Sequence, residues 1–104
     1  MKILNEQDFN SAISEKGISV VDFFADWCGP CKMLAPFFEQ AANEYTDVHF
    51  YKVNVDDSQS LAAKFDIYSI PTIIFFKDGN KVLQTTGFKS FEQLKSLIEQ
   101  VKTK

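Results

Sequence analysis

One short segment limits the folds open to this chain more than any other. Residues Ile18 to Phe24 read Ile-Ser-Val-Val-Asp-Phe-Phe, a run rich in β-branched and aromatic side chains that is apolar on both faces apart from Asp22. Such a run is typical of a central strand that is buried on both sides. The rest of the chain must therefore provide a layer of structure on each side of a sheet.

Helix and strand patterns alternate around this segment. Apolar spacings of three and four residues, with capping signals, predict helices between the Asn5–Asp8 signal and Gly17, over 31–45, after a cap at Asp57 or Ser58, and from the Ser90–Gln93 capping box to Val101. β-branched and aromatic runs predict further strands over 49–55, 72–76 and 81–86, the last two joined by a tight turn at 77–80. This order predicts parallel crossovers followed by a hairpin, in an α/β sandwich with helices on both faces.

Length and composition favour one ordinary globular domain over residues 1–104. Of the 104 residues, 45% are hydrophobic and 24% are charged, a balance that supports a single core. The longest uninterrupted apolar stretch, Ile73 to Phe76, has four residues, whereas a membrane-spanning helix needs about 20. The first residues contain no apolar segment or cleavage site typical of a secretion signal. We therefore expect a cytoplasmic protein, although a processed precursor would leave a similar start.

The charged residues argue against two further classes of protein. The net charge is −3, so the chain lacks the cluster of cations that nucleic-acid binding requires. All eleven cations are lysine, and the sequence contains neither a GxGxxG nor a Walker pattern. A nucleotide-dependent enzyme is therefore disfavoured, and we expect no bound cofactor.

The only two cysteines, Cys28 and Cys31, are three residues apart. A disulfide across so short a loop removes little entropy from the unfolded chain, so the pair makes a poor structural crosslink. Structural zinc needs about four ligands, and the one other soft ligand is the distant His49, which we interpret as a strand-end residue. A redox-active pair is the better explanation, because Cys28 would lie where a central strand leads into a helix, and Pro30 suits the first turn of that helix.

At these motifs the sequence resembles the thioredoxin family over essentially its whole length. The residues that carry the resemblance are Val21-Asp22-Phe23, Ala25-Asp26-Trp27-Cys28-Gly29-Pro30-Cys31-Lys32, Ala35-Pro36, Lys52-Val53-Asn54-Val55-Asp56, Ile70-Pro71-Thr72, Lys77-Asp78-Gly79 and Gly87. A bare CxxC is a weak signal, but the Trp-Cys-Gly-Pro-Cys form with a distant Ile-Pro-Thr is a strong one. The resemblance implies the thioredoxin fold, with a central mixed sheet of four to five strands flanked by about four helices.

The resemblance also implies a function and the residues that perform it. Cys28 would be an exposed nucleophile that attacks a protein disulfide, and Cys31 a buried thiol that resolves the mixed disulfide and leaves a Cys28–Cys31 bond. The expected partners are protein disulfide substrates and thioredoxin reductase, and the expected state is a monomer. Substrate contacts would come from Trp27, Gly29, Pro30, Ile70, Pro71 and Gly87.

Two alternatives to a protein-disulfide reductase stay open. An oxidase or isomerase could use the same fold, although the Gly29–Pro30 pair between the cysteines resembles that of reducing members. A binding or processivity subunit could carry the fold with incidental thiols. In that case the protein would keep its function after both cysteines were lost.

Asp22 interrupts an apolar strand and is a candidate general base for Cys31. Burial without a partner should make its carboxyl group hold the proton more tightly than it would in water. The alternative is an ordinary aspartate that faces solvent. The resemblance implies that Lys52 lies near this aspartate and tunes the catalytic site, but a solvated position on a strand explains Lys52 equally well.

Three further positions have competing interpretations. Sequence statistics alone give little weight to a cis Ile70–Pro71 bond, whereas the resemblance implies one, facing the cysteines. Trp27 could belong to the core or to a contact surface, and we favour the surface. Gly87 could equally be a purely structural glycine. Phe24 and Tyr68-Ser69 depart from residues common in the family, which puts the choice of partner in doubt.

Overall fold

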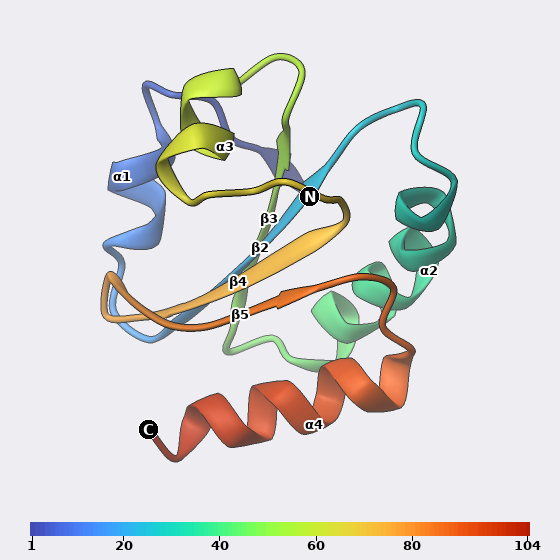
Figure 1. Ribbon diagram of the computed structural model, residues 1–104. Coiled ribbons are helices and arrows are strands. Elements are labelled where there is room, and N and C mark those ends of the chain that lie inside the picture. The colour runs from blue at the N-terminus through green and yellow to red at the C-terminus, as the bar shows by residue number, and fades with distance from the viewer.

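The computed structural model describes all residues, 1–104, and contains five strands and four helices (Figure 1). The strands are β1 (Lys2–Ile3), β2 (Ile18–Phe24), β3 (His49–Asn54), β4 (Thr72–Lys77) and β5 (Asn80–Thr86). The helices are α1 (Phe9–Ile13), α2 (Gly29–Glu44), α3 (Gln59–Lys64) and α4 (Phe91–Lys102). None of the helices combines the length and the apolar character that a membrane crossing requires.

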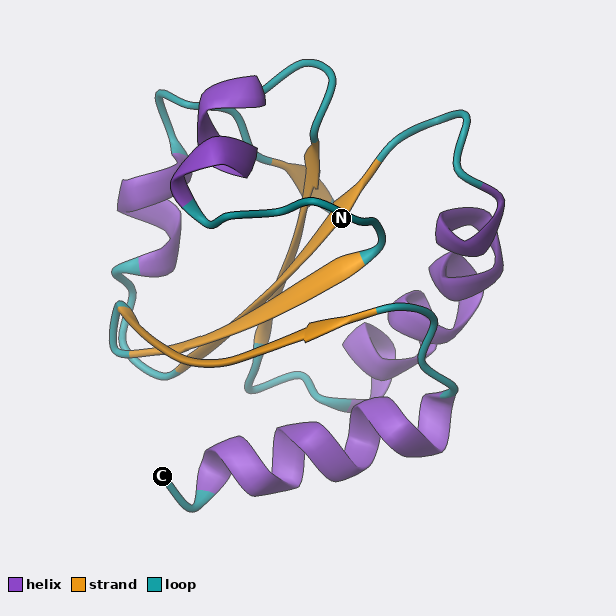
Figure 2. Ribbon diagram, in the orientation of Figure 1, coloured by secondary structure: helices purple, strands orange, loops and turns teal.

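The five strands form one mixed sheet in the order β1-β3-β2-β4-β5, with helices on both of its sides (Figure 2). Strand β2 lies in the centre of the sheet, as its two apolar faces predict. It runs parallel to β3 and antiparallel to β4. The prediction of parallel crossovers holds for the connection through α2. It is wrong for the connection through α3, because that connection leads into β4, which runs antiparallel to β2.

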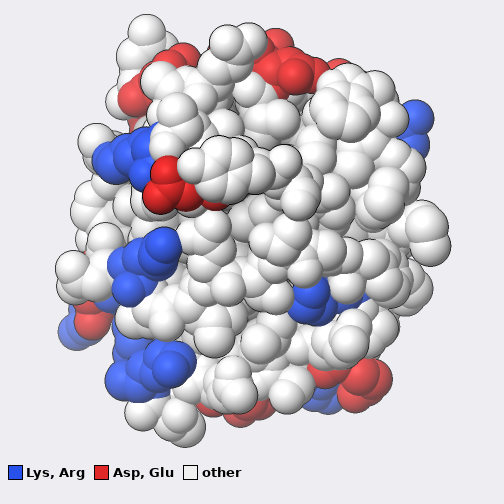
Figure 3. All heavy atoms as spheres, in the orientation of Figure 1, with Lys and Arg blue, Asp and Glu red and all other residues white.

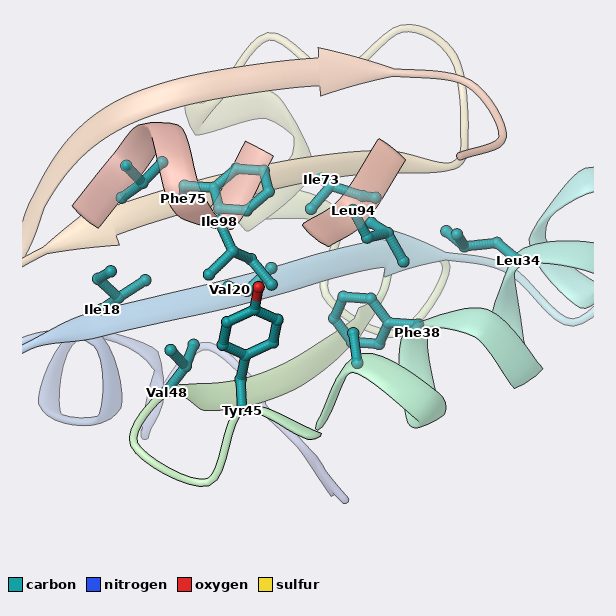
Figure 4. Packing of buried hydrophobic residues seen from close by; sticks show 12 residues of the cluster. Ile18, Val20, Leu34, Phe38, Tyr45, Val48, Ile73, Phe75, Leu94 and Ile98 are labelled. Atoms are coloured by element: carbon teal, nitrogen blue, oxygen red, sulfur yellow. The ribbon is translucent and has the colours of Figure 1, made fainter. Parts of the chain in front are cut away.

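Helices α2 and α4 cover one face of the sheet, and Figure 4 shows the side chains packed between them and the strands. Even-numbered residues of β2 lie on this face, because successive side chains of a strand point to opposite sides. Val20 packs there against Leu34 and Phe38 of α2 and Leu94 and Ile98 of α4. Asp22, two residues beyond Val20, therefore belongs to the face that α2 covers.

Helices α1 and α3 cover the opposite face. Phe9 of α1 is fully buried, and its ring lies near those of Phe23, Phe65 and Phe76, with centroid distances of 5.5 to 6.3 Å. Leu61 of α3 belongs to the same cluster. The sheet thus separates two apolar cores, and the central strands β2 and β4 are buried on both faces except for the last residue of each.

The N-terminal region differs most from the sequence prediction. Strand β1 was not predicted, because two exposed residues carry no periodic pattern. The reciprocal bonds of the Asn5–Asp8 capping signal are present, since each backbone N–H donates to the other residue's side-chain oxygen. However, α1 ends at Ile13 rather than near Gly17, and residues 14–17 form turns and bends.

The hairpin between β4 and β5 follows its sequence signal closely. Asp78 and Gly79 both have positive φ angles, +52° and +86°, which a two-residue turn between twisted strands requires. The Asp78 carboxylate accepts a hydrogen bond from the N–H of Gly17 at 2.7 Å. This bond ties the turn to the segment that enters β2.

Candidate active site

The two cysteines lie where the chain leaves the carboxyl end of β2 and enters α2. Cys28 has extended backbone angles and is the N-cap of α2, and Pro30 stands in the first turn. The N–H of Cys31 donates to Cys28 Sγ at 3.2 Å, and the two Cα atoms are 5.2 Å apart. The sulfur of Cys28 thus occupies the place of a capping oxygen, next to the positive end of the helix.

In this structure the two cysteines form a disulfide, and both are buried. Each cysteine exposes only 4% of its surface, so the expectation of an exposed Cys28 is wrong for the disulfide form. Cys28 Sγ is covered from the side of the loop before β4, since it lies 3.8 Å from the carbonyl oxygen of Ile70. Ala25 and the half-buried Phe24 pack on the same small cluster.

The loop before β4 carries the cis peptide bond between Ile70 and Pro71. Gly87, with a φ of +98°, donates its N–H to the carbonyl oxygen of Pro71 at 2.8 Å, so the two loops are held together. Neither the N–H nor the carbonyl oxygen of Ile70 takes part in a hydrogen bond within the backbone. The backbone of Ile70, beside the disulfide, therefore has an N–H and a carbonyl oxygen without a backbone partner.

Trp27 is 70% exposed, which agrees with the interpretation of this residue as part of a contact surface. Its indole N–H donates to Asp56 Oδ2 at 2.8 Å. Asp56 is itself held by a bond from its N–H to the side-chain oxygen of Asn54 at 2.9 Å. The ring is thus fixed at the surface by a partner from the end of β3, which the sequence analysis did not assign.

Asp22 is completely buried, and neither oxygen of its carboxyl group has a hydrogen-bond partner. The alternative of a solvent-facing aspartate is therefore wrong. Burial raises the pKa of Asp22 from 3.8 to about 7, and the positive charge of Lys52 opposes that rise. At neutral pH this carboxyl group can both accept and release a proton, as an acid–base group must.

Lys52 pairs directly with Asp22 in the parallel register of β2 and β3, so both side chains lie on the face that α2 covers. The Lys52 ammonium lies 4.4 Å from the centre of the Phe24 ring. Lys52 and Cys31 also line one hollow of about 150 Å³, which opens to the surface beside Asp26. Lys52 is therefore not a freely solvated strand residue, and the cation–π contact with Phe24 was not expected from the sequence.

His49 stands at the start of β3, as the sequence suggested. Its Nε2 lies 3.5 Å from the carboxylate of Glu15, a partner that sequence proximity could not reveal. Its ring stacks on Tyr51. No group of three or more potential metal-ligating side chains occurs around it or elsewhere in the chain.

Comparisons with known proteins agree with this site. The family model for thioredoxin matches residues 1–100. Thioredoxin of Chlamydia pneumoniae is 45% identical over 98 residues, which are 94% of this chain and 95% of that protein. The solved structure of Plasmodium falciparum thioredoxin superposes with a TM-score of 0.89 at 42% identity, covering 96% of this chain and 98% of that one. Fasciola hepatica thioredoxin gives the same TM-score and the same coverage at 38% identity.

The fold, the cysteine pair at the helix N-terminus and these relatives define a thiol–disulfide oxidoreductase, of the kind that reduces protein disulfides. The chain belongs to the thioredoxin family.

Proposed function

We propose that this protein reduces disulfide bonds in extended segments of other proteins, with Cys28 as the nucleophile and Cys31 as the resolving thiol. The observation that carries these roles is the hydrogen bond from the Cys31 N–H to Cys28 Sγ at the N-cap of α2. A helix N-terminus stabilises a thiolate relative to a thiol. Cys31 lies one helical turn further into the protein, where it can reach the same sulfur.

The proposed cycle begins with both cysteines reduced. The Cys28 thiolate attacks one sulfur of the target disulfide, which forms a mixed disulfide and releases the other target sulfur as a thiolate. Cys31 then loses its proton and attacks Cys28 Sγ, and the second target sulfur leaves. Two electrons pass from the protein to the target, the two released thiolates take up two protons, and the Cys28–Cys31 disulfide remains.

Asp22 is the proposed acceptor of the Cys31 proton. It is buried on the face of β2 that α2 covers, and its pKa of about 7 suits a transfer at neutral pH. Lys52 would adjust this group, since its charge favours the ionised carboxylate. The hollow beside Cys31 and Lys52 would give water a route along which the proton leaves.

The proposed contact surface for the target surrounds the disulfide. The N–H and the carbonyl oxygen of Ile70 have no backbone partner and can pair with an extended target backbone, as in the addition of a strand to a sheet edge. Exposed Trp27 would provide an aromatic contact. The remaining members of the proposed surface are Gly29, Pro30, Pro71 and Gly87.

We further propose that the protein is an electron carrier of cell redox homeostasis in the cytoplasm, recharged by thioredoxin reductase and active as a monomer without a bound cofactor. The cycle ends in a disulfide, so a separate source of two electrons is required. Cytoplasmic location agrees with the use of both cysteines in the redox pair, which leaves none for a structural disulfide. Fluorescence microscopy of a tagged copy would test the location.

Substitution of each cysteine tests the assigned roles. With Cys31→Ser, the first attack still occurs but resolution fails, so covalent mixed disulfides with target proteins should accumulate. With Cys28→Ser, the first attack fails, and both trapping and turnover should be lost. Non-reducing gels of the two variants incubated with a disulfide-containing protein measure the trapped species. Equal trapping by both variants would remove the distinction between nucleophile and resolving thiol.

A further inference from the structure

A shallow groove lies beside the disulfide, between α3 and the loop that leads to β4. It has a volume of about 250 Å³, and its apolar lining consists of Trp27, Val55, Ala62, Ile67, Tyr68 and Ile70. Ile70 also contacts the disulfide, since its carbonyl oxygen lies 3.8 Å from Cys28 Sγ. In Figure 3 the upper right of the molecule, where β2 leads into α2, is largely uncharged, with acidic side chains along the upper margin and a basic side chain at the right edge. A target polypeptide on Ile70 would therefore extend over this groove.

Two carboxylates stand next to the groove. Asp56 follows the groove residue Val55 in the chain and holds Trp27, and the exposed Asp66 precedes Ile67. No charged side chain lines the groove. The nearest lysine in the chain, Lys64, does not line the groove, and its ammonium lies 5.5 Å from the centre of the Phe65 ring. No lysine among the groove residues would therefore repel a cationic side chain of a partner.

Tyr68 is the most exposed large apolar or aromatic residue, with 91% of its surface accessible. Its hydroxyl group lies 3.5 Å from Asp66 Oδ1, so an aromatic face and a carboxylate stand side by side. The backbone just before Tyr68 is held to α3, since the N–H of Ile67 donates to the carbonyl of Ala62 at 2.9 Å. Little ordering of this loop backbone is needed when a partner binds.

We propose that Tyr68 and Asp66 form a recognition site for a lysine or arginine side chain of the target protein. The cation would lie on the face of the Tyr68 ring and pair with the Asp66 carboxylate at the ring's edge, while apolar parts of the target fill the groove. This inference rests on the proposed function, because it concerns the choice among targets that Cys28 reduces. Tyr68 and Asp66 take no part in the redox steps.

The test uses a set of synthetic peptide disulfides that differ at one position at a time. Arginine, glutamine or glutamate is placed in turn at each of four positions on either side of the cysteine, and kcat/KM for reduction is measured at low salt. We expect one position at which arginine is preferred over glutamine by about three- to tenfold, with glutamate the poorest. The preference should decrease at high salt, since the site is exposed.

Variants of Tyr68 and Asp66 test whether these residues cause the preference for arginine. In Tyr68→Ala the ratio of kcat/KM for the arginine peptide to kcat/KM for the glutamine peptide should approach one. In Tyr68→Phe this ratio should keep the value of the unmodified protein, and in Asp66→Asn it should fall. Glu39→Gln is the matched control, because this exposed carboxylate lines a different hollow, beside Met1. In Glu39→Gln the ratio should equal that of the unmodified protein. Rates that do not depend on peptide charge at any position, or a preference that survives Tyr68→Ala, would overturn the proposal.

A separate measurement distinguishes failure of this inference from failure of the proposed function. Reduction of a small uncharged disulfide by the unmodified protein reports the cysteine chemistry without any contact to Tyr68. If that reaction proceeds and the peptides show no charge preference, only the recognition site is wrong. If that reaction is absent, the proposed reductase chemistry is wrong, and the recognition site with it.

Discussion

At the scale of single residues, the carboxyl group of Asp22 is buried at a cost to stability. It lies in a strand whose apolar side chains pack in two cores, and it has no hydrogen-bond partner. An isolated buried charge is so unfavourable that the group keeps its proton instead, which is why its pKa rises to about 7. A residue that destabilises the fold and is poised to exchange a proton at neutral pH is typical of a functional site.

The pKa of Asp22 fixes how it affects stability at each pH. The folded value, about 7, lies above the ordinary value of 3.8, so between these two values the folded protein holds a proton that the unfolded chain has released. Stability therefore falls as pH rises from about 4 to 7, and the full cost, roughly 4 kcal/mol at most, applies above pH 7. Below pH 4 both states are protonated and this cost is absent.

Asp22→Asn should therefore stabilise the protein at neutral pH and slow its turnover. The amide is also unpaired, so we expect a gain of about 1–3 kcal/mol at pH 8, which disappears toward pH 4. Because the proton acceptor is lost, resolution of the mixed disulfide should slow by about tenfold or more, with the first attack much less affected. Urea unfolding at several pH values and stopped-flow turnover measure the two effects.

The exposed Asp26 provides the control for this prediction. Asp26→Asn removes a carboxylate from the same segment without changing a buried group, so its stability should follow that of the unmodified protein at every pH. A stability difference for Asp22→Asn that does not depend on pH, or intact turnover, would contradict the role of Asp22 as a buried base.

At the scale of elements, α4 shows which interactions a sequence can predict. The Ser90–Gln93 capping box is present as predicted: Ser90 Oγ accepts from the Gln93 N–H at 3.2 Å, and Gln93 Oε1 accepts from the Ser90 N–H at 2.9 Å. These partners are three residues apart, so local pattern contains them. At the other end of α4, Lys77 of β4 donates to the carbonyl oxygens of Lys102 and Lys104. That cap joins distant segments, and no local pattern predicts it.

Loss of the N-terminal cap should weaken α4 and the core that it covers. Ser90→Ala removes the acceptor for the Gln93 N–H and should lower the free energy of unfolding by about 1 kcal/mol. Ser96→Ala is the matched control, because Ser96 is exposed within the same helix and alanine favours the helix. It should leave stability equal or slightly higher. If both variants unfold at the same urea concentration, the capping box does not stabilise the protein.

The difference between local patterns and contacts of distant segments also explains which other helices and strands were predicted correctly. Strand β2, the hairpin turn and α2 follow from strong local patterns, and they agree with the structure to within one or two residues. Strand β1 has only two residues, and it exists because Lys2 and Ile3 pair with Tyr51 and Lys52 across the sheet. The direction of β4 is likewise a property of the assembled sheet. Pairing between distant segments is what the local sequence does not encode.

At the scale of the whole molecule, the sheet brings three separate segments to one edge. The stretch from the end of β2 to the start of α2, the loop before β4 and the loop after β5 meet around the disulfide, held by the contact of Cys28 with Ile70 and the bond between Gly87 and Pro71. The motifs indicated the members of this site, because each is locally distinctive. The contacts of Trp27 with Asp56 and of Tyr68 with Asp66 could not be predicted, since exposed aspartates have no distinctive pattern.

The assembled site also affects the reduction potential of the cysteine pair. A helix N-terminus stabilises the Cys28 thiolate, which favours the reduced form and makes a pair more oxidising. Here that effect is limited. Pro30 has no N–H to offer, the N–H of Lys32 is bonded to the Cys28 carbonyl oxygen, and the Cys31 N–H is the one donor to the sulfur. The nearby buried Asp22 also opposes further negative charge once it is ionised.

We therefore expect this protein to be reducing rather than oxidising. The expected potential is close to that of thioredoxin, about −270 mV, rather than to the value of about −120 mV of a strong disulfide oxidant. Equilibration with glutathione and with dithiothreitol buffers, followed by alkylation of free thiols, measures it from two independent references. Agreement of both near the lower value supports a reductase that needs a separate electron donor. A potential near about −120 mV would mean that the surroundings of Cys28 stabilise its thiolate far more than a single hydrogen bond can, and the protein would then form disulfides in its targets instead of breaking them.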